Sequence, residues 1–326
     1  MKKRWFFAGA AGLLAALFLG CVLAVGRSTQ WFGLELLAQG ASPQWTFERQ
    51  VTWDPELSSV EGLRISWGDG PVSVEPCEGT MITVTEYADR PLEKEECLEL
   101  TSSGGVLKIQ WDHSLLPLSM FQGLKKRLEV KVPPAILSQL EVFSCGSASG
   151  KVDVTGVTAQ EVEVASSAGD LYLLSLQGEK VRLSTVSGEV QWTQGRAEEL
   201  SLTTTSGQVR LSQVQAGVCG LSTVTGEVHF QGSGRELSVN TISGQVYLDV
   251  TGGLEEADLR SVSGGLSLTL PEQAAFQAAY SSMSGRFRSE FPGTEEEGTF
   301  LCRTGGASLR FTTTSGNMTV HRQKGA

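Results

Sequence analysis

Residues 181–230 read VRLSTVSGEVQWTQGRAEELSLTTTSGQVRLSQVQAGVCGLSTVTGEVHF, and this stretch decides the fold. It holds three copies of a Ser-Gly or Thr-Gly pair, at Gly188, Gly207 and Gly226, which are 19 residues apart. A fixed period of this length is typical of repeat proteins, in which each copy is one structural unit stacked on the next. The sequence therefore predicts a repeat architecture.

The repeat continues on both sides of this stretch. The recurring glycines, which we call the corner glycines, are Gly150, Gly169, Gly188, Gly207, Gly226, Gly244, Gly264, Gly285 and Gly316. Apolar side chains recur two and four positions after these glycines and five and seven positions before them, with mostly polar residues between. This alternation is typical of β-strands with one buried face. Each repeat is thus predicted to be a strand, a Ser-Gly corner and a second strand.

The fold class follows from how such repeats bury their apolar faces. A single repeat cannot form a core alone, so its strands must pair with the equivalent strands of its neighbours. We predict an all-β parallel β-solenoid with rungs of about 19 residues. The alternative is an antiparallel meander of hairpins, but two-residue hairpin turns favour Asn-Gly or Asp-Gly, whereas Ser-Gly suits a corner whose glycine has a positive φ.

A hydroxyl side chain precedes every corner glycine by three positions, and its parity directs it inward. The members of this hydroxyl column are Ser147, Ser166, Thr185, Thr204, Thr223, Thr241, Ser261, Ser282 and Thr313. A buried hydroxyl is costly unless it is hydrogen-bonded. We therefore expect a structural ladder of hydroxyls, bonded along the stack or to carbonyls at the corners.

The N-terminus predicts a membrane anchor. Three cations, Lys2, Lys3 and Arg4, are followed by 21 uncharged residues from Trp5 to Val25. A helix of that length spans one hydrocarbon core, and the cations before it orient the chain with its N-terminus inside. Two alternatives stay open: cleavage of a signal peptide after Ala24, or lipidation at Cys21. In every case the rest of the chain lies outside the cytoplasm.

The predicted domain organisation has four parts. Residues 1–27 are a cytoplasmic basic tip and transmembrane anchor, and 28–57 are a juxtamembrane or capping segment. Residues 58–142 carry a weaker form of the alternation and are interpreted as irregular opening rungs of the solenoid, with a separate small β domain as the alternative. Residues 143–326 form the regular Ser-Gly repeats and a C-terminal cap.

Charge argues against nucleic acid as a partner. The formal net charge is −10, and four of the 26 cations lie in the first 27 residues, which leaves 22 cations against 36 carboxylates elsewhere. A body of that sign repels phosphate backbones.

No motif predicts a catalytic, cofactor-binding or metal-binding residue. The best candidate for chemistry is the column directly after the corner glycines: Lys151, Asp170, Glu189, Gln208, Glu227 and Gln245. Its neighbouring carboxylates would suit calcium or acid–base catalysis, whereas the simpler interpretation is a solvated edge. The histidines show no metal-ligand spacing. Cys77 and Cys97 are the one pair that we consider for a disulfide.

A row two residues before the corner glycines is a candidate binding surface. It contains Val186, Thr205, Val224, Ile242, Val262 and Met283, and simple parity points these side chains outward. Exposed apolar rows can dock partners. The alternative is that the backbone kinks at the corner and turns the row inward, which the exposure of Ile242 decides. We call this row the apolar stripe.

These motifs resemble a known family. The segments Leu63-Arg-Ile, Gly70-Pro-Val-Ser-Val and Leu128-Glu-Val-Lys-Val-Pro133, followed by serial Thr-x-Ser-Gly-x-Val copies, are similar to the bacterial putative-adhesin family, a domain of unknown function made of β-strand repeats. The resemblance covers roughly residues 58–320. It implies a membrane-anchored or surface-exposed protein and carries no functional residues over.

Together these observations predict a non-enzymatic scaffold of the cell envelope or surface, either an adhesin or an accessory protein that senses the envelope. The expected location is the cell membrane, crossed once, with the C-terminal part extracytoplasmic. Expected partners are the membrane, through the N-terminal helix, and envelope glycans or another surface or signalling protein; no cofactor is expected. The alternative function is a carbohydrate-active enzyme, a lyase or hydrolase built on a β-helix.

Overall fold

The computed structural model describes residues 45–54, 59–111 and 123–323, which lie in a compact unit of residues 45–326. Short opening strands come first: β1 (Phe47–Trp53), β2 (Gly62–Trp67), β3 (Val72–Pro76), β4 (Ile82–Ala88), β5 (Glu99–Ser103), β6 (Val106–Trp111) and β7 (Lys126–Val132). The repeats supply β8 (Leu140–Ser147), β9 (Val152–Thr155), β10 (Thr158–Ser166), β11 (Leu171–Leu174), β12 (Gln177–Ser187), β13 (Val190–Ser206), β14 (Val209–Thr225), β15 (Val228–Ser243), β16 (Val246–Val250), β17 (Glu256–Ser263) and β18 (Leu266–Leu270).

The C-terminal strands are β19 (Phe276–Ser282), β20 (Phe287–Ser289), β21 (Thr294–Glu296), β22 (Thr299–Cys302), β23 (Ala307–Thr313) and β24 (Met318–Arg322). Helical structure in the described residues is limited to the 3₁₀ turn η1 (Lys94–Glu96) and the single-turn helix α2 (Pro134–Leu137). The described part of the chain is therefore all-β.

The predicted fold class needs one correction. We expected a transmembrane helix before the stack, but no helix of the described residues is long and apolar enough to cross a membrane. The segment concerned, Trp5–Val25, lies outside the described residues. For its described residues, the fold class that the structure supports is all-β.

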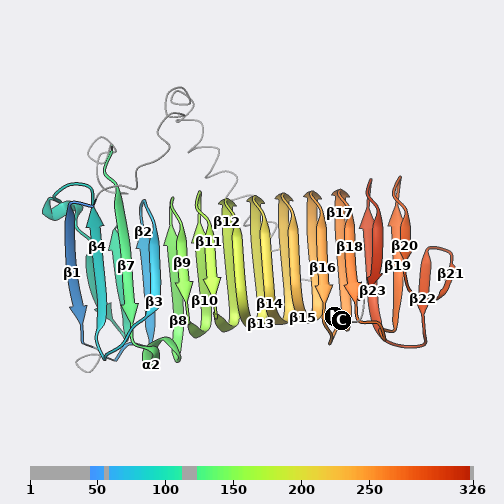
Figure 1. Ribbon diagram of the computed structural model, residues 1–326, viewed down its shortest axis with the longest axis horizontal. Helices are drawn as coiled ribbons and strands as arrows, with labels where there is room; N and C mark the ends of the chain where they lie inside the picture. The colour runs from blue at the N-terminus through green and yellow to red at the C-terminus, as the bar shows by residue number, and fades with distance from the viewer. Residues whose placement is uncertain (1–44, 55–58, 112–122, 324–326) are drawn as a thin grey trace. The chain divides into compact units, whose positions relative to one another are not determined.

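Successive repeats run parallel and in register (Figure 1). Each turn gives one strand to each of two ladders, with the corner glycine between them. Leu183 pairs with Leu202, and Leu202 with Leu221, so a given side chain meets its equivalent one repeat later. An antiparallel meander is therefore excluded for β8–β18, because hairpins would pair these strands in opposite directions.

The order of turns departs from chain order at both ends of the stack. At the C-terminal end, β23 and β24 lie between β17–β18 and β19–β20. At the N-terminal end, β2 and β3 pair with β8 and β9, while β6 and β7 lie outside them. Antiparallel strands then cover the ends, with β1, β4 and β5 at one and β21 and β22 at the other. Such covers protect exposed strand edges from pairing with other chains.

The core lies between the two ladders and is made of stacked apolar columns. Trp192, Leu202, Leu211 and Leu221 are at most 2% exposed, and the pattern repeats in each turn. Cys219 occupies one of these columns, and its burial raises the pKa of the thiol to about 12. This cysteine therefore serves as a small apolar side chain.

The corner glycines are required by close approach of the backbone. A Cβ at Gly207 would lie 1.9 Å from the carbonyl oxygen of Gly188, and one at Gly264 would lie 1.9 Å from that of Gly244. All nine corner glycines show such an approach, at 2.5 Å or less. From the sequence we expected that glycine is needed at the corners because φ is positive there. Among the nine corner glycines, φ is positive at five: Gly150, Gly188, Gly207, Gly226 and Gly244.

The hydroxyl column points inward, but it does not form the expected ladder. Ser147 Oγ donates to the carbonyl of Ser149 at 2.7 Å, and Thr185 Oγ1 donates to that of Gly169 at 3.4 Å. Six hydroxyls of the column, all of them in the described residues, find no hydrogen-bond partner: those of Ser166, Thr204, Thr223, Thr241, Ser261 and Thr313. The reason is geometric, because equivalent side chains stand about 4.8 Å apart along the stack, beyond hydrogen-bond distance.

Candidate functional site

The apolar stripe faces outward on the ladder that precedes the corners. Ile242 is 51% exposed, Val262 is 49% exposed and Met283 is 86% exposed. Val186, Thr205 and Val224 are half-buried. The kink that would turn the row inward is therefore not formed. Because β23 lies between β17 and β19, exposed Thr314 interrupts the stripe between Val262 and Met283.

The column after the corner glycines binds backbone atoms of the next turn. Asp170 Oδ1 accepts a hydrogen bond from the Glu189 N–H at 2.7 Å. Gln245 Oε1 accepts one from the Gly265 N–H at 3.0 Å, and Asn317 Oδ1 one from the Arg286 N–H at 3.2 Å. These side chains tie neighbouring turns together at the corner. The column thus has a structural role that the sequence interpretation as a solvated edge missed.

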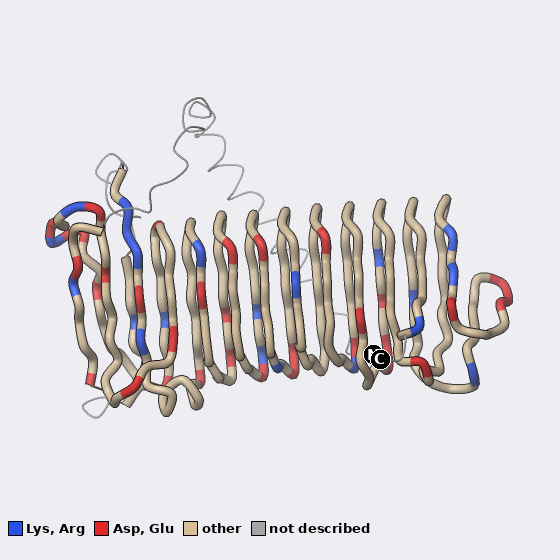
Figure 2. Tube along the Cα trace, viewed as in Figure 1, with Lys and Arg blue, Asp and Glu red and all other residues tan. Residues whose placement is uncertain are grey.

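Charges on the outer faces are paired between and within turns. Glu189 forms an ion pair with Arg210, Lys180 with Glu161 at 3.6 Å, and Arg260 with Asp258 at 2.6 Å. Cations and carboxylates are accordingly interspersed along the stack (Figure 2). No group of three or more potential metal ligands occurs among the described residues. The Asp170–Glu189 pair is therefore explained by its backbone bond and its ion pair.

A hollow of about 580 Å³ opens on the other ladder, next to the corners of three adjacent turns. Its lining includes Gln245, Tyr247, Gly265, Ser267, Asn317 and His321. The hollow exists because the column of long polar side chains is interrupted at Gly265, which has no side chain. The side chain of Ser267, two residues further along the same turn, is also short. Tyr247 stacks on His229, with ring centroids 4.8 Å apart and planes 19° apart, and remains 41% exposed. We call this feature the Gly265 hollow.

Sequence reasoning did not find this hollow, although a signal was present. The pair Gly264-Gly265 puts a second glycine where earlier repeats have Asp170, Glu189 or Gln245. The other half of the hollow comes from residues 315–321, around Gly316, which is the second corner glycine after Gly264 in the chain. Only the inserted position of β23 and β24 makes them neighbours of Gly265.

A buried cation closes the N-terminal end of the stack. In the opening turns, Trp67 and Trp111 occupy the position that the hydroxyl column has in the repeats. Trp67 pairs with Ser147 on one side and with Trp111 on the other. The Lys126 ammonium lies over both rings, 5.0 Å and 3.8 Å from their centroids, and forms a fully buried ion pair with Glu86. Burial lowers the pKa of Lys126 to about 8, while Glu86 acts in the opposite direction.

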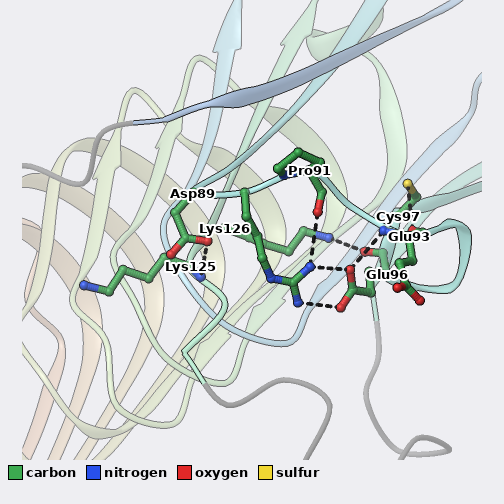
Figure 3. A network of polar contacts seen from close by, with 8 residues as sticks. Asp89, Pro91, Glu93, Glu96, Cys97, Lys125 and Lys126 are labelled. Atoms are coloured by element: carbon green, nitrogen blue, oxygen red, sulfur yellow. Dashed lines mark hydrogen bonds and ion pairs between the residues drawn. The ribbon is translucent and has the colours of Figure 1, made fainter.

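From buried Glu96 the same cluster continues to Arg90, whose side chain is partly exposed to solvent (Figure 3). Lys126 Nζ donates to the Glu96 carbonyl at 2.7 Å, and the Glu96 carboxylate receives two hydrogen bonds from Arg90, at 2.6 Å and 2.7 Å. These bonds lower the pKa of Glu96 to about 2. Every polar group of this network thus serves to close the end of the core, and we assign it a structural role.

The cysteines of the described residues are all free thiols. Cys77 and Cys97, the pair considered for a disulfide, are half-buried, and each donates to a nearby carbonyl, of Met81 and Glu93 respectively. Burial raises the pKa of Cys77. The fold is thus built without a disulfide in its described part.

A stack of parallel turns with regular outer columns defines a repeat scaffold. The chain belongs to the Toastrack DUF4097 family, which it matches over residues 60–321. The resemblance to the bacterial putative-adhesin family is thereby confirmed. No curated protein matches the sequence.

Solved structures similar to this chain include three from Bacteroides and Parabacteroides. A putative adhesin from Bacteroides fragilis is 12% identical, with 87% of this chain and 100% of that chain covered and a TM-score of 0.47. A putative lipid binding protein from Parabacteroides distasonis is 13% identical, with coverage of 85% and 97% and a TM-score of 0.45. A putative adhesin from the same species is also 13% identical, with the same coverage and a TM-score of 0.44.

Proposed function

We propose that the protein is a non-enzymatic scaffold that binds a partner of the cell envelope or surface through the outer face of its stack. The observation that carries this proposal is the exposure of the apolar stripe, in which Ile242 and Val262 stand on adjacent turns with about half of each side chain in solvent. Apolar side chains that are repeated in register on a flat ladder form a contact surface without a catalytic cleft.

The geometry of the polar columns supports a binding function over catalysis. An acid–base pair for glycoside cleavage requires two carboxyl groups that face one substrate from a shared cleft. In the best candidate pair, Asp170 accepts a backbone hydrogen bond from the next turn, and Glu189 is held by Arg210. Both carboxylates therefore already have partners within the stack.

The binding proposal is tested by sedimentation of the purified full chain with isolated bacterial cell walls. We expect the chain to sediment with the walls and the double variant Ile242→Lys, Val262→Lys to remain largely in the supernatant. The matched control is Leu174→Lys, Leu301→Lys, which also replaces two exposed apolar side chains, 43% and 41% exposed, but outside the stripe. Absence of wall binding, or equal loss in both double variants, contradicts the proposal.

The enzyme alternative is tested with the same preparation. The chain is incubated with soluble wall polysaccharides, and newly formed reducing ends are measured over time. We expect none above the buffer control. Release of sugar that Glu189→Gln abolishes would replace the scaffold proposal by the carbohydrate-active alternative.

A further inference from the structure

The Gly265 hollow is a gap one turn wide in two outer columns of the stack. On one side stand Gln245 and Tyr247, and on the other Asn317 and Thr319. The turn between them contributes Gly265, which has no side chain, and Ser267, which pairs with Tyr247 and Thr319 in the ladder. The two walls are thus about 9.6 Å apart, which is twice the strand spacing.

Tyr247 supplies an aromatic wall to this gap. One face of its ring is covered by His229, with nearly parallel planes. The neighbouring turn on the other side offers only Ser267, so the side chain stays partly exposed there. A ring-shaped ligand in the gap would continue the stack of His229 and Tyr247 as its next member.

The amide groups in the hollow have a fixed orientation. Gln245 and Asn317 each use the side-chain oxygen to accept a backbone N–H, from Gly265 and Arg286. These bonds use only the oxygen of each amide, so the NH₂ group of each amide remains as a hydrogen-bond donor for a ligand. Hydroxyls of Ser267 and Thr319 add groups that both donate and accept. Among the residues that the structure describes, no lysine, arginine or carboxylate lines the hollow.

We propose that the Gly265 hollow binds a pyranose ring of a neutral saccharide. This rests on the proposed function, because it names a ligand for a scaffold that binds envelope material, in a hollow on the ladder that follows the corners, whereas the apolar stripe lies on the ladder that precedes them. The C–H face of a sugar ring packs on a tyrosine, and its hydroxyls accept from amide N–H groups and exchange hydrogen bonds with serine and threonine. An aromatic ligand would stack equally well but would leave these polar groups unpaired. An anion would meet no lysine or arginine of the described residues, and the lining His321 is already in contact with the Glu290 carboxylate, 3.0 Å away.

The test is isothermal titration calorimetry of the full chain with three neutral probes: cellohexaose, chitohexaose and mannohexaose. We expect at least one to bind, and Tyr247→Ala to weaken that binding by about tenfold through loss of the stacking contact. The matched control is Tyr172→Ala, in the same column, where Lys151 lies 4.3 Å over the ring. Binding to Tyr172→Ala should equal that of the unaltered chain.

A second variant fills the hollow. Gly265→Asn restores a long polar side chain to the column, and the atom nearest to its Cβ is Gln245 Oε1, 2.3 Å away, so the Gln245 side chain must shift to make room. We expect this variant to fold, as judged by circular dichroism, and to lose saccharide binding. If none of the three probes binds, or if Tyr172→Ala and Tyr247→Ala weaken binding equally, the saccharide proposal is wrong. Wall binding that persists without saccharide binding leaves the scaffold proposal standing.

Discussion

Replacement of a corner glycine by alanine should destabilise the stack through contact with the turn before it. At Gly207 the new Cβ would lie 1.9 Å from the Gly188 carbonyl oxygen, whereas real Cβ atoms essentially never come closer than 3.0 Å to such an atom. The two turns must therefore separate locally by 3.0 minus 1.9, or about 1.1 Å. A hydrogen bond near 3 Å does not survive that displacement.

The magnitude follows from the hydrogen bonds beside this contact. The Gly188 N–H donates to the Ser206 carbonyl at 3.3 Å, and the Val190 N–H donates to the Gln208 carbonyl at 2.8 Å. Each buried backbone group left without its partner costs about 1 to 3 kcal/mol. We therefore expect the close approach in Gly207→Ala to lower the free energy of unfolding by about 2 to 6 kcal/mol.

Two matched variants separate close approach from backbone conformation. Gly264→Ala meets the Gly244 carbonyl at 1.9 Å but has no positive φ, whereas Gly252 has φ +158° and no atom within 4 Å of a new Cβ. Measured by urea unfolding, Gly264→Ala should lose about 2 to 6 kcal/mol through the close approach alone. Gly207→Ala, which also has φ +151°, should lose about 1 to 2 kcal/mol more, and Gly252→Ala only about 1 to 2 kcal/mol. The reasoning is refuted if Gly264→Ala is as stable as Gly252→Ala.

Three further changes test the closing cluster and the hydroxyl column. Lys126→Met removes the nearer cation from the buried Glu86 carboxylate, whose other cation, Arg49, lies 3.9 Å away, and should cost about 3 to 5 kcal/mol in urea unfolding. Addition of Glu86→Gln should recover part of this loss, and an absence of recovery contradicts the ion pair. The pKa of Glu96 is about 2, below its ordinary value of 4.5. The contribution of this carboxylate to stability is therefore present above pH 4.5 and is lost as the pH falls toward 2. Glu96→Gln should reduce the fall of the melting temperature between pH 4.5 and pH 2, and an unchanged fall counts against the Arg90 contact. Thr204→Val removes a buried hydroxyl without a partner and should raise stability by about 1 kcal/mol, whereas a loss of that size would indicate a hydrogen bond that the structure lacks.

Local patterns in the sequence were sufficient for the repeat itself. The 19-residue period and the two-residue alternation predict which side chains enter the core, and Leu202, Leu211 and Leu221 are all buried as expected. This works because each strand has only two faces, so parity alone assigns a side chain to the core or to the surface. The same parity predicts the outward direction of Ile242.

The hydroxyl column shows where parity stops being informative. Parity correctly predicted that Thr204 and Thr223 are buried. It could not predict whether their hydroxyls find hydrogen-bond partners, because that depends on the distances between turns. The closing cluster was not predicted either, because Glu86, Lys126 and the two tryptophans come from four separate strands. No periodic signal links them in the chain.

The repeat unit, its period and its two faces follow from the amino-acid sequence alone, since these depend on neighbours along the chain. The order in which units stack was decided only by the tertiary structure, because strands from different repeats present the same backbone groups and equivalent apolar columns to a neighbour. In chain order, Arg286 and Arg288 would have stood beside Gly265 and Ser267. The inserted turn puts Asn317 and Thr319 there instead, and thereby changes a cationic edge into a neutral, amide-lined hollow.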